Sequence, residues 1–188
     1  MPYIGNSHNV GTHVNNFKVL DDISSHVETF NGSAAAIVST SDNSIRVPDH
    51  RFVQGQRVVY NNGGGGNIGG LTSGTAYFIS FDSHNTIKLA ATLADANTNN
   101  VINLASVGSG SSHTITSGFD GINTVFKLTF GGKTARVNNA AQLNIAINNV
   151  VQRPNLNHLS FTDGIAIKDF NTIVFKNPPT VNLSLIHI

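Results

Sequence analysis

The 188-residue chain has no cysteine and no tryptophan, and its charged share of 11 % is about half the usual quarter. Without cysteine it can form neither a disulfide framework nor a thiolate metal site. The formal net charge is +1 and the basic residues are scattered singly, so no nucleic-acid binding is expected. No apolar run approaches the roughly 20 residues of a membrane helix, so no membrane insertion is expected either.

Carboxylates are also scarce. Glu28 is the single glutamate, and most aspartates stand in turn contexts, where their side chains bond to their own backbone. No serine lies in a GxSxG elbow, and no nucleophile stands beside a base. The sequence therefore predicts a protein that is not an enzyme, with no catalytic residue. A hydrolase is the weakest of the hypotheses.

The sequence is instead rich in residues that favour strands and turns. The stretches "QRVVY", "TAYFISF" and "TIKLA" alternate apolar and polar residues between turn signals, as half-buried strands do. The pattern predicts an all-β fold of two small sandwich-like or barrel-like domains with short helical turns. Thr92 is expected to cap one such turn and "NNAAQ" to form another. Residues 17–30 fit either a strand or a helix capped by Asp21 or Asp22.

The domain organisation follows from composition and from two matching ends. Residues 1–16 lack periodicity and are expected to form an extended arm. Residues 17–46 and 118–182 are expected to form an outer domain, and residues 47–117 an inserted one. "LDDISS" and "TSGFDG" would be the two ends of one interrupted connection, since insertions are tolerated at exposed loops.

The run "GGGGNIGG" between two strand patterns raises the question of a phosphate-binding loop. Such loops need a lysine and a serine or threonine directly after the glycines, at the start of a helix. Here the run leads into "LTSGTAYF", which has no lysine and reads as a strand. The run is therefore predicted to be the loop of a long hairpin.

Histidine pairs and a group of aromatic residues are two further candidate sites. His8 with His13, or His50 with His113, could hold a metal only if folding brought them together, and a structural role is favoured. Tyr77 and Phe81 lie four residues apart on one strand face, and with Tyr60 they could stack on a sugar. Core packing is the favoured interpretation of these rings. No metal and no cofactor is predicted.

The stretch from His50 to Ile115 resembles a module that recurs in tailed-phage structural proteins and some large surface proteins. It begins with "HRF", continues with a valine-rich strand ending in tyrosine and a Gly-Leu-Thr turn, and closes with "TIKLA", a short "DA" helix and "HTI". The module carries no known catalytic residue. This copy has Gln56 where the module usually has an acidic residue.

The stretches "FDGINTVFKLTF", "LNIAINNVVQ", "LSF" and "TIVF" resemble the β-domain that begins many phage tail fibres. "YIGN" and "KVLDDISS" resemble the openings of virion proteins of marine cyanobacterial phages. The resemblance implies a virion structural protein, assembled in the host cytoplasm into the phage tail. The implied partners are other virion or tail proteins and further copies of the chain, with a trimer favoured.

Two functions remain open. The first is a non-enzymatic tail-fibre or adaptor component that mediates attachment to the tail or host, with Tyr3, Ile4, Gly5 and Asn6 as a docking arm. The second is a carbohydrate-binding module that recognises host surface glycans through Tyr60, Tyr77 and Phe81.

The last residues, "LSLIHI" at 183–188, resemble translated sequencing-adaptor sequence. We expect them to be non-native and the natural chain to continue past Asn182. They could still substitute for a last strand, because an exposed sheet edge leaves backbone groups unpaired. A strand or a loosely held extension at the domain edge is therefore expected here.

Overall fold

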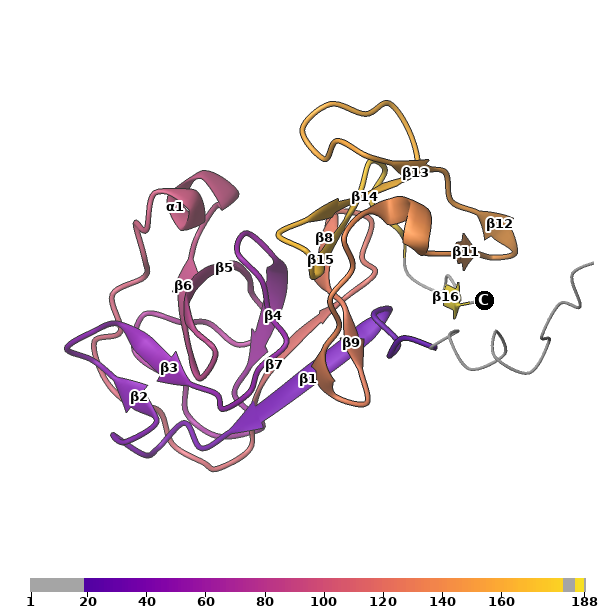
Figure 1. Ribbon diagram of the computed structural model, residues 1–188. Coiled ribbons are helices and arrows are strands. Elements are labelled where there is room, and N and C mark those ends of the chain that lie inside the picture. The colour runs from indigo at the N-terminus through magenta and orange to yellow at the C-terminus, as the bar shows by residue number, and fades with distance from the viewer. Residues whose placement is uncertain (1–18, 181–184, 188) are drawn as a thin grey trace, which may run out of the picture.

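The computed structural model describes residues 19–180 and, for the backbone, 185–187 (Figure 1). Strands dominate, with one short α-helix, α1 (Leu93–Asn97), and one 3-10 turn, η1 (Ala140–Gln142). The predicted all-β fold is confirmed. No helix in the described part of the chain is long and apolar enough to cross a membrane.

The first half of the chain forms one antiparallel seven-stranded sheet in the order β1-β7-β4-β5-β6-β3-β2. Its strands are β1 (Ser25–Phe30), β2 (Val38–Ser39), β3 (Ser44–Arg46), β4 (Arg57–Asn61), β5 (Ala76–Ser83), β6 (Thr86–Ala90) and β7 (His113–Gly118). Alternate residues of β4 and β7 are buried, as their sequence patterns predict. Residues 24–118, which contain this sheet, are called the seven-stranded unit below.

The remaining strands are shorter and form three small sheets, in the orders β10-β9, β12-β11-β16 and β13-β14-β15-β8. They are β8 (Val125–Lys127), β9 (Thr129–Phe130), β10 (Lys133–Thr134), β11 (Ile145–Ile147), β12 (Val150–Val151), β13 (Pro154–Asn155), β14 (Ile165–Lys168), β15 (Thr172–Phe175) and β16 (Leu185–His187). Residues 19–23 and 119–180 are called the small-sheet unit.

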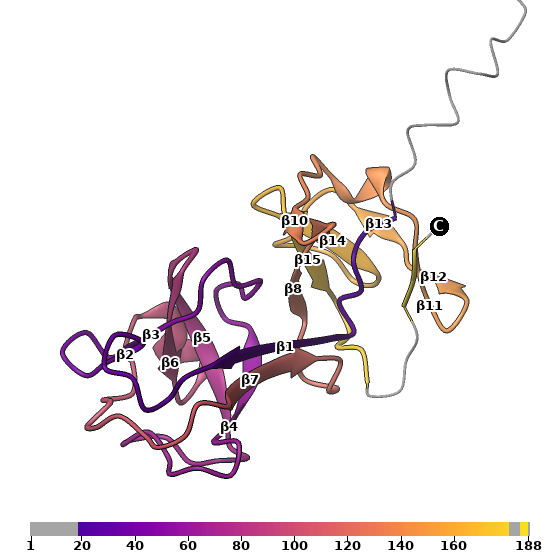
Figure 2. The ribbon, with the colours of Figure 1, turned by 90° about the horizontal axis from the view of Figure 1, so that it is seen from below.

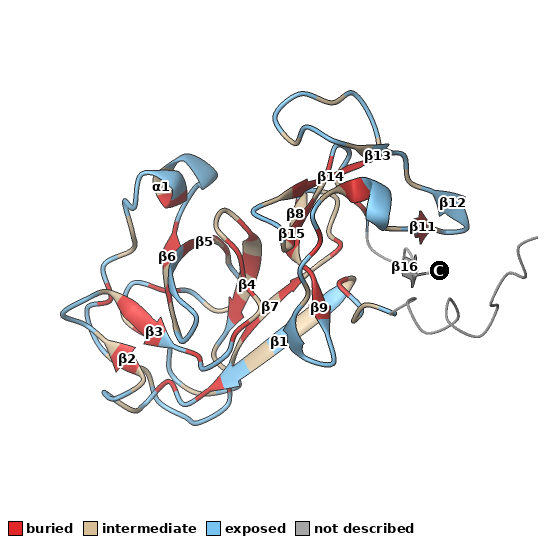
Figure 3. Cartoon of the chain, in the orientation of Figure 1, coloured by how far each residue is buried: buried red, intermediate tan, exposed pale blue. Residues whose placement is uncertain are grey.

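Each unit has its own cluster of buried apolar side chains (Figure 3). The cluster of the seven-stranded unit includes Phe52, Ile79 and Ile115. The cluster of the small-sheet unit includes Phe126 and Ile173, and also draws in Ile23 from before β1. "TVFKLTF" therefore belongs to a different apolar cluster from the central strands, a separation that the insertion hypothesis requires.

The chain passes between the units in two neighbouring stretches. β1 and β7 lie side by side along their length, and Ser25 pairs with Gly118 at the end nearest the small-sheet unit (Figure 2). Just beyond this pair, the Phe119 amide donates to the Ser24 carbonyl at 2.9 Å. The entry to the seven-stranded unit and the exit from it are thus hydrogen-bonded neighbours.

The sequence predicts a domain boundary at residue 47, but strands before and after residue 47 belong to the same seven-stranded sheet. Strands β1, β2 and β3, which the sequence placed in the outer domain, belong to the seven-stranded sheet. Phe30, Val38 and Ile45 on them are buried in its core. The reason is that β1 pairs along six residues with β7, a partner far along the chain. The assignment of two domains, one inserted in the other, stays a prediction.

Several local predictions are confirmed. The Thr92 side chain accepts from the Asp95 amide at the start of α1, and Asn139 caps η1 in the same way. Asn148 and Asn149 both have positive φ in the β11–β12 turn, as a two-residue hairpin requires. The strand expected near the C-terminus is β16, which pairs with β11 at the edge of its sheet.

Candidate functional site

Tyr60, on β4, is fully buried rather than exposed for sugar stacking. His113 Nε2 faces the Ser109 carbonyl at 3.0 Å and must donate to it, so His113 Nδ1 accepts from the Tyr60 hydroxyl at 2.8 Å. The same hydroxyl accepts from the Ile68 amide at 3.1 Å. Burial raises the pKa of Tyr60 above its ordinary value. Tyr60 is therefore a core residue that anchors the loop after β4.

The other two rings of the expected sugar platform do not join Tyr60 at a surface. Tyr77 is buried, and its hydroxyl accepts from the Thr72 amide at 2.9 Å. Phe81 is 38 % exposed and packs edge-on against His50 and His84. The alternation that suggested a platform instead places Tyr77 in the core, and the strand pairing becomes irregular after Phe81. These three residues form no common stacking surface.

His50 has a structural role in the seven-stranded unit. Its Nε2 lies 2.7 Å from the Ser83 carbonyl, its Nδ1 accepts from the Phe52 amide at 3.2 Å, and its ring stacks on Phe52. Burial lowers the pKa of His50. Like His113, it uses both ring nitrogens inside the fold. Within the described residues, no group of three potential ligands could hold a metal, and His8 and His13 lie outside them.

The glycine run forms the loop of the β4–β5 hairpin and packs against the segment before β7. Gly66 and Ser109 exchange backbone hydrogen bonds at 3.1 Å. A Cβ on Gly63, Gly65 or Gly70 would collide with a backbone carbonyl of that segment. The loop amides are bonded to neighbouring oxygens, including those of Asn61, Asn62 and Ser109. The glycines permit close approach of two backbones and do not form a phosphate cradle.

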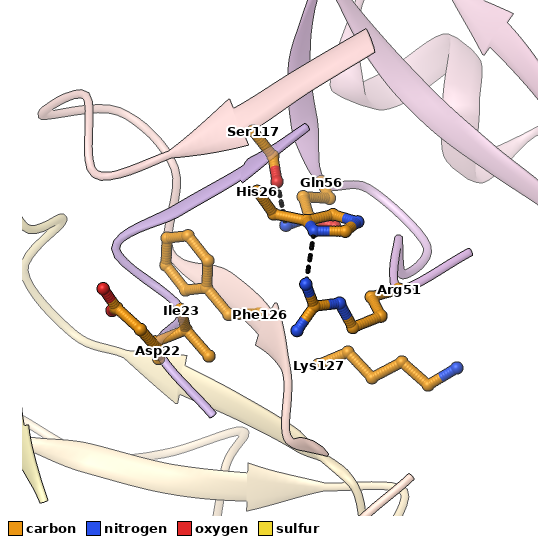
Figure 4. Close-up of a pocket in the computed structure, with 8 residues that line it drawn as sticks. All are labelled: Asp22, Ile23, His26, Arg51, Gln56, Ser117, Phe126 and Lys127. Carbon is orange, nitrogen blue, oxygen red and sulfur yellow. Dashed lines mark hydrogen bonds between the residues drawn. The ribbon is translucent and has the colours of Figure 1, made fainter. Parts of the chain in front are cut away.

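Polar side chains gather instead at the junction of the two units. A small cavity of about 20 Å³ lies there, and Figure 4 shows its lining. The residues come from the crossing strands, from the loop before β4 and from β8: Asp22, Ile23, His26, Arg51, Gln56, Ser117, Phe126 and Lys127.

Arg51 is the centre of this junction. Its guanidinium donates to His26 Nδ1 at 2.9 Å and to Thr129 Oγ1 at 3.3 Å, and it lies 3.8 Å from Asp21. His26 Nε2 also lies 2.7 Å from a Glu28 carboxylate oxygen, without the geometry of a hydrogen bond. Arg51 thus connects β1 of one unit with β9 of the other.

Asp21 fixes the small-sheet side of the junction. Its carboxylate accepts from the amides of Gly131 and Gly132 at 2.9 and 2.8 Å. Hydrogen bonds from Thr129 and Gly132 lower the pKa of Asp21. The alternative of a helix capped by Asp21 is not found, and Asp21 instead holds the β9–β10 turn.

Gln56 lies deep in the same junction and is almost fully buried. Its Nε2 donates to Ser117 at 3.2 Å, while its Oε1 accepts from the Val53 amide at 3.0 Å. An amide performs both roles, which a carboxylate could not. Glutamine therefore suits this buried position.

A wider groove of about 720 Å³ opens beside the cavity. Its rim carries four carboxylates and the Arg51 guanidinium, with Asp21, Asp22, Glu28 and Asp49 as the acids. Such a rim attracts cationic groups, but acids alone do not define a ligand. On the other side of the crossing strands, Arg57 forms an ion pair with Asp120, and Asn123 exchanges hydrogen bonds with the Arg57 backbone. Side-chain contacts between the two units therefore lie on both sides of the crossing strands.

Sequence reasoning missed this junction, because Arg51, His26 and Thr129 are far apart in the chain and match no motif. The expected docking arm, Tyr3 to Asn6, lies outside the described residues. No family model matches the chain, and searches of curated proteins and of solved structures found no match.

Proposed function

We propose that the chain is a non-enzymatic structural component of a phage virion, a tail-fibre or adaptor protein that mediates attachment to the tail or host. The observation that carries the proposal is the arrangement of the two units. They follow one another through paired crossing strands, with Arg51 bracing one side and Arg57 the other. Two β-units held together by such contacts suit a spacer that keeps neighbouring parts of a fibre at a fixed separation.

The small-sheet unit supplies the docking surface in this proposal. It exposes large apolar side chains on β12 and the loop after β13, including Val150, Val151, Leu156 and Leu159. Exposed apolar groups of this kind are typical of interaction surfaces. The partners are other virion proteins and further copies of the chain, with a trimer as the favoured assembly by analogy with fibres.

The test is the location of the chain in purified particles of a phage that encodes it. Antibody labelling of particles, with mass spectrometry of the same preparation, should find the chain in the tail. Sedimentation of the recombinant protein should give a mass above that of one chain. Absence of the chain from purified particles would overturn the proposal.

The alternative, a carbohydrate-binding module based on Tyr60, Tyr77 and Phe81, finds no support at those residues. Two of the rings are buried, and their hydroxyls serve the loops around them. Replacing them would damage the fold before it tested sugar binding.

A further inference from the structure

Phe170 stands out among the turn residues of the described chain. It has φ +62 in the three-residue turn between β14 and β15. Positive φ is costly for a bulky side chain and suits glycine, asparagine and aspartate. The other described non-glycine residues with positive φ are all asparagine or aspartate: Asn43, Asp49, Asn99, Asn148, Asn149 and Asp169. Phenylalanine is therefore unfavourable for the backbone at this position, and its presence there must be explained by what its side chain does.

The backbone of this turn is held from two sides. The Phe170 carbonyl accepts from the Val137 amide, and the Asn171 carbonyl accepts from the Leu128 amide, both at 2.7 Å. These bonds tie the turn to the segments around Leu128 and Val137. Asparagine at position 170 would meet the backbone requirement with less strain.

The ring itself is also held, but not buried. The Arg136 guanidinium lies over it, 4.6 Å from the ring centroid. A cation over an aromatic face is an attractive arrangement. Phe170 nevertheless remains 49 % exposed. The turn thus presents an oriented aromatic ring to solvent at an energetic cost to the backbone.

The surroundings of the ring favour a sugar over a protein surface. Its chain neighbours are the exposed Asp169, whose carboxylate can accept from hydroxyls, and the half-buried Asn171, whose Nδ2 can donate while its Oδ1 accepts from the Thr172 hydroxyl at 3.1 Å. A protein partner needs about 800 Å² of surface with an apolar centre, whereas this is one ring among polar groups. A pyranose offers an apolar C–H face for stacking and hydroxyls at its rim. The charged groups beside the ring, Asp169 and Arg136, are of opposite sign, so neither an anionic nor a cationic sugar is favoured.

We propose that Phe170, oriented by Arg136, is the stacking platform of a binding site for one neutral pyranose unit of a glycan, with Asp169 and Asn171 bonding to its hydroxyls. The site lies in the small-sheet unit and shares no residue with Tyr60, Tyr77 or Phe81. It does not depend on the virion assignment, because the recombinant chain should show it alone.

The experiment measures binding of the full chain to immobilised neutral oligosaccharides of glucose, galactose, mannose and N-acetylglucosamine. Phe170→Asn removes the ring and relieves the backbone, so affinity should fall about tenfold or more while the melting temperature stays or rises. Phe170→Tyr keeps the ring and should keep binding. Phe81→Thr removes an exposed ring of the other unit and should leave binding unchanged.

Two results would overturn the proposal. The first is no binding of the wild-type chain to any of these glycans at millimolar concentration. The second is wild-type affinity in Phe170→Asn; a lower melting temperature of that variant would then show that the ring is a packing element. If Phe170→Asn does not fold, Arg136→Ala decides, because undiminished affinity with a released ring contradicts the platform.

Discussion

The two units differ in the length of their strands and in how many large apolar side chains they leave exposed. The seven-stranded unit places strands of up to eight residues in one continuous sheet, whereas the small-sheet unit has strands of two to four residues in three sheets. Of the exposed large apolar residues in the described part of the chain, three lie in the former unit and eight in the latter. The three are Val27, Phe81 and Leu93, and the eight are Val19, Ile122, Phe130, Val150, Val151, Leu156, Leu159 and Phe170. The contrast indicates that the small-sheet unit buries its large apolar side chains less completely.

The most drastic way to break this comparison is to separate the units. Because Ser24 and Phe119 are hydrogen-bonded neighbours, residues 24–118 can be excised and Ile23 joined to Phe119 through a two-residue linker. We expect the excised seven-stranded unit to fold alone and to melt cooperatively. The remainder should fold with lower stability. Circular dichroism and amide exchange of both products check this, and an unfolded 24–118 fragment would contradict it.

A substitution that creates a cavity in one of the two cores should lower the stability of the unit that contains it. Phe126→Ala in the small-sheet unit should cost about 3–5 kcal/mol and unfold that unit first. Ile79→Ala in the seven-stranded unit should cost about 2–5 kcal/mol and shift the other transition. Urea titrations followed by residue-resolved NMR separate the two events. A single transition that shifts equally in both variants would show that the units unfold as one.

Acid should weaken the seven-stranded unit through His50. Burial lowers the folded-state pKa of His50, so below about pH 6.5 the unfolded chain binds a proton that the folded chain resists. The contribution of His50 is thus fully present above that pH and is lost as the pH falls towards the folded-state pKa. Unfolding free energies between pH 8 and pH 5 measure it. His50→Gln should flatten this slope, and an unchanged slope would assign the loss to other groups.

The junction should contribute least to stability. Arg51→Gln removes the bonds to His26 and Thr129, but the guanidinium is partly exposed, so the loss should stay under about 1 kcal/mol. The relative orientation of the units should nevertheless loosen. Residual dipolar couplings of the two units check this, with Arg46→Gln, an exposed arginine on β3, as the matched control. Unchanged orientation in Arg51→Gln would place the bracing elsewhere.

Local sequence signals predicted local structure well. The alternation in β4 to β6, the Thr92 cap of α1 and the asparagine pair of the β11–β12 turn each depend on neighbouring residues alone. The partner of β1 could not be predicted, because Ser25–Phe30 fits a helix or a strand and its choice is made by β7. Alternation also could not distinguish a stacking surface from a core, which is why Tyr60 and Tyr77 were ambiguous.

The candidate sites, like the partner of β1, could not be predicted from neighbouring residues in the sequence. Arg51 meets His26 and Thr129 only after three distant segments fold together, so no spacing in the sequence indicates the junction. Phenylalanine is not a turn residue, so the sequence gives no sign of the positive φ of Phe170, whose carbonyl accepts from the distant Val137 amide. Both sites depend on tertiary contacts, which a single sequence does not display.

The glycine-rich loop after β4 has a practical consequence for engineering the chain. A run of glycines looks like the natural place for an epitope tag or a labelled residue. Here the backbones of residues 63–70 and 103–112 lie in direct contact, so even alanine at Gly65 would push them apart. The β9–β10 turn has free space around Gly131 and Gly132, but both have positive φ, so a side chain at either position would strain the backbone. The exposed Lys133 beside them is the better position for a label, because the two amides bonded to Asp21 then stay in place.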